Sequence, residues 1–198
     1  MKIIAGTLLI LVLGAVGGVV FVTTGVFNVS AMYDDPAAIH WIIGNVRRYS
    51  IKRRAETITV PALDDRGLIA SGASAYGDMC AGCHGAPGQK PFVGAGDMNP
   101  PPPNLAELVK HREPGELFWA IKNGIRMTGM PAWSKTHSDE EVWQLVGFIK
   151  QLPGLSAADY DTMLSEAVLG GHAHDHESDD VDHHTAEDTH PEHEGHNH

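Results

Sequence analysis

The apolar and polar positions of this chain follow different patterns in different regions. Residues 3–27 are almost continuously apolar and contain no ionisable side chain. At about 1.5 Å per residue this run exceeds the thickness of a bilayer's hydrocarbon core, about 30 Å, so it predicts one membrane-spanning helix. In residues 36–54 and 138–154 apolar side chains return every three or four positions, which predicts helices with an apolar face.

Further helices are expected between these regions. Residues 68–79 favour a helix that leads into the cysteines, and residues 113–123 favour another, which ends at a glycine. Ser138, with Glu141 three residues later, is a capping pattern at the start of the last apolar repeat. The fold class predicted is therefore all-α.

Composition divides the chain into four parts. They are a transmembrane anchor (1–30), an amphipathic juxtamembrane helix with a linker (31–65), a helical domain (66–165) and a disordered tail rich in His, Asp and Glu (166–198). The net charge is -11, and most of it comes from the nine acidic residues at positions 171–198. Because the rest of the chain is close to neutral, its charge argues against a nucleic-acid partner.

The N-terminal run has an alternative interpretation as a cleaved signal peptide. Residues 29–31 form an acceptable cleavage site, and Lys2 supplies a short basic start. The apolar run is, however, longer than the roughly 7 to 15 residues typical of signal peptides, which favours a retained anchor in contact with membrane lipid.

The juxtamembrane segment combines apolar, aromatic and basic side chains. Ile39, Ile42 and Val46 recur at helical spacing, and five basic residues follow between positions 47 and 54. The pattern fits a helix that lies on anionic lipid. An ordinary solvated helix and a docking site for an acidic partner are the alternatives.

The only two cysteines, Cys80 and Cys83, stand directly before His84. A Cys-x-x-Cys pair can form a redox dithiol, half of a zinc site or, when His follows, a covalent attachment site for haem. Zinc needs about four ligands, and His84 with the distant His111 or His137 would make an unusual set. A thioredoxin-type dithiol is expected between a strand and a helix, and a helix is predicted upstream here. Haem attachment needs only the residues that are present.

A low-spin haem needs a second axial ligand, usually a thioether. Met130 lies in a Gly-Met-Pro sequence, in which Gly129 permits close approach and Pro131 stiffens the loop. Met127 is the weaker candidate.

The chain resembles the class I cytochrome c family in three short sequences that occur in the order "CAGCHG", "PPPNL" and "TGMPAW". It resembles more closely the membrane-anchored monohaem cytochromes of proteobacteria. The resemblance implies one covalently attached haem c, with thioether bonds to Cys80 and Cys83 and with His84 and Met130 as axial ligands. It also implies that the carbonyl of Pro103 accepts a hydrogen bond from His84.

The same resemblance implies a class I cytochrome c fold, in which the first and last helices of the domain cross. Gly72 against Leu145 and Phe148 is the expected crossing, and Trp119 and Trp133 are candidates for packing on the haem. The implied function is single-electron transfer without catalysis, between membrane or periplasmic partners such as a terminal oxidase or another oxidoreductase. The expected location is the cytoplasmic (inner) membrane, crossed once, with the haem domain in the periplasm.

Two alternatives to a simple electron carrier remain. One is a catalytic or sensor haem protein with a labile distal ligand. The other couples the haem to periplasmic metal handling, because imidazoles mixed with carboxylates suit Cu, Ni or Zn. The nine candidate ligands in the tail are His172, His174, His176, His183, His184, His190, His193, His196 and His198.

Overall fold

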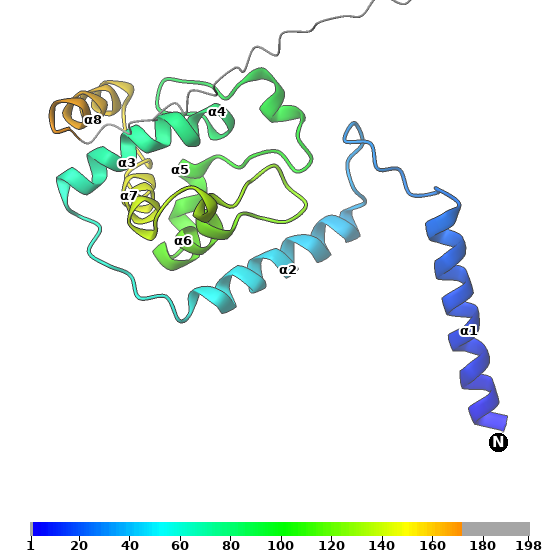
Figure 1. Ribbon diagram of the computed structural model, residues 1–198. Coiled ribbons are helices and arrows are strands. Elements are labelled where there is room, and N and C mark those ends of the chain that lie inside the picture. The colour runs from blue at the N-terminus through cyan, green and yellow to red at the C-terminus, as the bar shows by residue number, and fades with distance from the viewer. Residues whose placement is uncertain (1, 172–198) are drawn as a thin grey trace, which may run out of the picture.

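The computed structural model describes residues 2–171, and all regular elements in this part are helices, as predicted (Figure 1). The α-helices are α1 (Lys2–Thr23), α2 (Ala37–Ala55), α3 (Arg66–Met79), α4 (Ala81–His84), α5 (Leu105–Leu108), α6 (Pro114–Asn123), α7 (Asp139–Ile149) and α8 (Ala157–Leu169). Three 3-10 turns span Val93–Asp97, Val109–His111 and Trp133–Lys135. The nine histidines of the tail lie outside the described residues.

The domain is organised around the crossing of α3 and α7. A Cβ atom added at Gly72 would lie 2.6 Å from the carbonyl carbon of Gln144 and 3.0 Å from Cβ of Phe148. Only glycine permits so close an approach of the two backbones. The predicted crossing at Gly72 is therefore present, and its backbone partner is Gln144 rather than Leu145.

Local sequence accounts for the ends of the helices. At the start of α7, the Ser138 hydroxyl accepts a hydrogen bond from the Glu141 N–H, and the Glu141 carboxylate accepts one from the Ser138 N–H at 2.7 Å. This capping box satisfies two amides that the helix leaves without partners. Helix α6 ends at Gly124, whose φ of +64° favours glycine.

Helix α8 was not predicted, and it packs along α3. Tyr160 is 1% exposed, its ring lies 5.5 Å from that of Phe148, and Ala167 is fully buried. The boundary predicted between residues 165 and 166 falls inside this helix, so the ordered chain continues beyond the predicted start of the tail.

Helix α2 lies alongside the domain with its C-terminal half against α6 (Figure 1). Ile51 is only 8% exposed, and the guanidinium carbon of Arg54 lies 5.7 Å from the centre of the Trp119 ring. The carbonyl oxygen of Ala55 lies 3.5 Å from the position of a Cβ on Gly115. The segment predicted as a juxtamembrane helix is thus partly packed onto the domain.

Helix α1 is the one described helix long and apolar enough to cross a membrane. Its 22 residues correspond to about 33 Å, which matches a bilayer core. None of them is buried against the rest of the protein.

Candidate functional site

The two cysteines and His84 lie on consecutive turns at the end of α3. The backbone N–H of Cys80 donates to the Tyr76 carbonyl at 2.9 Å, so Cys80 continues the helix. Its own carbonyl then accepts the N–H groups of Cys83 and His84 at 3.1 and 2.9 Å, which forms the single turn of α4. Residues three and four apart on a helical turn share one side, so both thiols and the imidazole are presented together. The thiols are free, with Cys80 buried and Cys83 half-buried.

The His84 ring is oriented by the loop that follows it. Its Nδ1 lies 3.0 Å from the carbonyl oxygen of Pro103, close enough to donate a hydrogen bond. A proton held on Nδ1 leaves the lone pair of Nε2 free to act as a ligand. His84 and Pro103 are 19 residues apart in the sequence, and the loop that connects them contains the Val93–Asp97 turn.

Tyr76 holds the start of this loop. Its buried hydroxyl donates a hydrogen bond of 2.5 Å to the carbonyl of Gly85, the residue after His84. Gly85 adopts a φ of +74°, which turns the chain away from α4. Burial, together with the neighbouring Cys80 and Tyr160, raises the pKa of Tyr76 well above its usual value.

The environment of the thiols argues against a redox dithiol. Burial, and then the neighbouring Cys83, raise the pKa of the Cys80 thiol to about 12. Reactive cysteines have lowered pKa values, because the thiolate is the nucleophile and the metal ligand. Cys80 is therefore a protonated, apolar side chain at neutral pH.

The alternative zinc site is not assembled. Among residues 2–171, no group of three or more His, Cys, Asp or Glu side chains could hold a metal ion. His137 lies instead against Trp133, with 5.5 Å between the ring centres and the rings nearly perpendicular.

The loop that carries Met130 is held by hydrogen bonds of its own. The N–H of Ile125 donates to the Met130 carbonyl at 3.2 Å, and the Met130 N–H donates to the Thr128 hydroxyl at 3.1 Å. Met130 packs against the core, whereas Met127 is 79% exposed and has a φ of +59°. This geometry favours Met130 over Met127 as the second axial ligand.

Close packing ties the Met130 loop to its neighbours. A Cβ at Gly124 would lie 2.6 Å from the carbonyl carbon of Pro131, so the two ends of the loop touch. A Cβ at Gly129 would lie 3.1 Å from the sulfur of Met98, which comes from the loop that leads to Pro103. This Met98 contact could not be predicted from the sequence, because it joins two loops that are distant along the chain.

The two candidate tryptophans lie in different surroundings. The Nε1 atom of Trp133 is buried and has no hydrogen-bond partner among the described residues. A buried N–H without a partner is costly, so this atom fits a polar group of a bound cofactor. Trp119 instead faces Arg54 of α2, and that contact accounts for its position without a cofactor. With two free thiols and an oriented imidazole, the site fits a covalently held haem.

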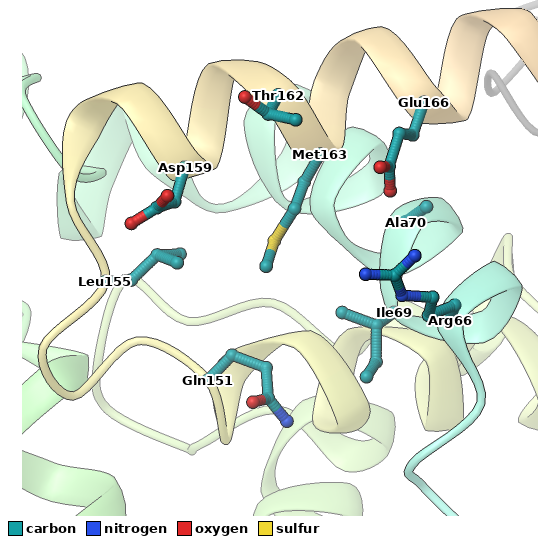
Figure 2. A pocket seen from close by; sticks show the side chains of 9 residues that line it. All are labelled: Arg66, Ile69, Ala70, Gln151, Leu155, Asp159, Thr162, Met163 and Glu166. Carbon is teal, nitrogen blue, oxygen red and sulfur yellow. The ribbon is translucent and has the colours of Figure 1, made fainter.

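A separate open cleft of about 360 Å³ lies between α3 and α8. Figure 2 shows Met163 pointing into it and Arg66 and Glu166 near each other at one end. None of the residues that line it belongs to the Cys-x-x-Cys-His sequence or the Met130 loop. It is therefore distinct from the candidate haem site.

Comparison with known proteins agrees with this geometry. Residues 67–149 match the family model for cytochrome c oxidase, cbb3-type, subunit III. The chain is also 32% identical over 91 residues to the cbb3-type cytochrome c oxidase subunit CcoP of Azospirillum sp. (strain B510). That match covers 46% of this chain and only 30% of the relative's length. With one Cys-x-x-Cys-His sequence in an all-helical domain that follows an apolar helix, the chain is similar to membrane-anchored class I c-type cytochromes.

Proposed function

We propose that Cys80 and Cys83 hold one haem c through thioether bonds, with Nε2 of His84 and the sulfur of Met130 as its axial ligands. The observation that carries this proposal is the contact between His84 Nδ1 and the Pro103 carbonyl. It orients an imidazole directly after the two thiols and leaves Nε2 available, as a ligand to iron requires.

Bound haem supplies a one-electron couple at its iron, and a thioether ligand raises the reduction potential relative to two histidines. The protein's own contribution is to fix both ligands and to limit access of water. Pro103 holds the imidazole, the hydrogen bonds of Thr128 and Ile125 hold the Met130 loop, and Trp133 offers an N–H donor. With two protein ligands in place, no position is left for a substrate, which supports electron transfer rather than catalysis.

The proposed partner is a membrane-bound terminal oxidase of the cbb3 type. The name of the similar Azospirillum protein supports this choice, because it describes a subunit of such an oxidase. We place the haem domain in the periplasm, since class I cytochromes of this kind are matured outside the cytoplasmic membrane. The anchor α1 would hold it beside other membrane-bound redox proteins.

Absorption spectroscopy of the holoprotein tests the ligation. Ferric haem with methionine coordinated shows a weak charge-transfer band at long wavelength. We expect Met130→Ala to remove this band, because it deletes the sulfur proposed as the second axial ligand, and to allow rapid binding of carbon monoxide after reduction. Met127→Ala is the matched control and should leave both properties unchanged, since Met127 is exposed.

The proposal is wrong if the wild-type holoprotein binds carbon monoxide as fast as Met130→Ala, because the distal position would then be open. That result would favour the catalytic or sensor alternative. A chain produced without colour in a host able to attach haem would overturn haem binding itself.

The histidine-rich tail favours a second candidate function in metal handling. Nine histidines and nine acidic residues lie between positions 171 and 198, and this donor set suits Cu(II), Ni(II) or Zn(II). Deletion of residues 172–198 should lower copper tolerance or cellular electron flow if the tail delivers metal to a redox partner. Unchanged values of both would exclude that role.

A further inference from the structure

Helix α2 has two functionally different faces. Ile51 and Ala55, one turn apart, lie toward the domain, and Ile51 is 8% exposed. Ile42, Val46 and Tyr49 follow each other at steps of four and three residues, so they form one stripe. At 100° per residue this stripe lies opposite Ile51 on the helix.

The face toward the domain is held by several kinds of contact. Ile51 fills an apolar position, and the Ala55 backbone lies against Gly115 at the start of α6. Arg54 stacks on Trp119 and also donates to the Ser50 hydroxyl at 2.7 Å. At the other end of the segment, the side-chain amide of Asn99 donates to the Tyr33 carbonyl at 3.1 Å. The segment of residues 33–55, which contains α2, is thus attached to the domain near both of its ends.

The opposite face is apolar but uncovered. Ile42 is 50% exposed, Val46 61% and Tyr49 64%, and Trp41, on a different side of the helix, is 70% exposed. A contiguous exposed apolar stripe indicates an interaction surface rather than ordinary solvent contact. No part of residues 2–171 covers it.

Charge and chain length favour anionic lipid as the partner of this face. Helix α2 carries five basic and no acidic residues, whereas the remainder of the chain is acidic overall. Among the described residues, Arg47, Arg48 and Lys52 form no ion pair. Only 13 residues separate the end of α1 from the start of α2, a reach of at most about 45 Å. Tyr and Trp rings with basic side chains are typical of helices in the headgroup region.

We propose that α2 is an adaptor that places the cytochrome domain on the membrane. Its outer stripe of Ile42, Val46 and Tyr49 enters the headgroup region of an anionic bilayer, while its inner face holds α6. Since the domain is fixed to the helix, the orientation of the domain relative to the bilayer is fixed as well. This inference does not depend on haem, because it rests on the surface of α2 alone.

Site-specific photo-crosslinking tests the proposal with the full-length holoprotein. A photo-crosslinking amino acid replaces Val46 on the outer stripe or, as a control, the exposed Thr162 on α8. The protein is irradiated in its own membranes and in vesicles of phosphatidylcholine with or without phosphatidylglycerol. We expect lipid adducts from position 46 and none from position 162, with a lower yield when phosphatidylglycerol is absent.

Two paired variants test the stripe itself. Ile42→Glu with Tyr49→Glu should abolish the lipid adducts, because carboxylates are repelled by anionic headgroups. Val168→Glu with Leu169→Glu makes the same change at two exposed apolar positions of α8 and should leave the adducts unchanged. Protein adducts at position 46, or none of any kind, would overturn the proposal. Because the readout is a lipid adduct, a failure of haem ligation would not affect it.

Discussion

At the scale of single residues, close packing at Gly72 decides how the two central helices cross. The position of its missing Cβ is occupied by backbone atoms of Gln144 and by Cβ of Phe148. Backbone atoms cannot rotate away as the end of a flexible side chain can. Any side chain at this position must therefore separate α3 from α7, and α3 leads directly into Cys80 and Cys83, the residues proposed to attach haem.

We predict that Gly72→Ala lowers the free energy of unfolding by at least about 1–3 kcal/mol, the usual cost of overpacking a core. The measurement is the midpoint of denaturant-induced unfolding, followed by circular dichroism. Gly96→Ala is a suitable control, because no atom lies within 4 Å of the added Cβ and the residue is exposed. Equal midpoints for both variants would show that the crossing tolerates a methyl group.

Because of the Tyr160 hydroxyl, we expect the stability of the fold to change with pH in the alkaline range. Burial, and then the nearby carboxylate of Asp78, raise its pKa from 10.0 to about 12. The fold thus favours the neutral phenol, so this stabilisation is complete below pH 10 and is lost between pH 10 and pH 12. Tyr160→Phe should show a shallower loss of stability over this range in denaturation curves. A decline as steep as that of the wild type would contradict the assignment.

At the scale of elements, the sequence predicted the helices whose apolar repeat or caps are complete. Helix α7 has both an apolar face and the Ser138 capping box, and α6 ends at a glycine with positive φ. Helix α8 was missed because its buried residues, Tyr160 and Ala167, lie among polar positions with a weak apolar repeat. Its burial comes from contact with α3, which local sequence does not encode.

We predict that α8 unfolds cooperatively with the rest of the domain. Substitutions at two neighbouring positions of α8, one buried and one exposed, can test this. Ala167 is fully buried, whereas Val168 is 67% exposed. Ala167→Glu should lower the free energy of unfolding by at least about 1–3 kcal/mol, because it adds volume and a charge at a packed site. Val168→Glu introduces the same side chain on the solvent-exposed side of α8. It should change the free energy of unfolding by less than about 0.5 kcal/mol. Chemical denaturation monitored through the core aromatics distinguishes the two.

At the scale of the whole molecule, the sequence predicted an order of parts but not the contacts between them. The Cys-x-x-Cys-His sequence and the Gly-Met-Pro sequence were recognisable because their chemistry depends on residues close together in the chain. The packing of α2 on α6, the contact of Met98 with Gly129 and the separation of Trp119 from Trp133 depend on tertiary structure. Such contacts have no local periodicity from which to predict them.

Helix α2 packs against the domain, whereas α1 does not. Two truncations should therefore show different contributions of α1 and α2 to the stability of the domain. A chain of residues 31–198 should unfold at the same denaturant concentration as the full chain, because no residue of α1 is buried. A chain of residues 57–198 should unfold earlier, since it loses the apolar contact of Ile51 and uncovers Trp119. Loss of one buried aliphatic side chain typically costs about 2–5 kcal/mol. Coincident unfolding of the two fragments would mean that α2 contributes nothing to the domain and only connects it to the membrane.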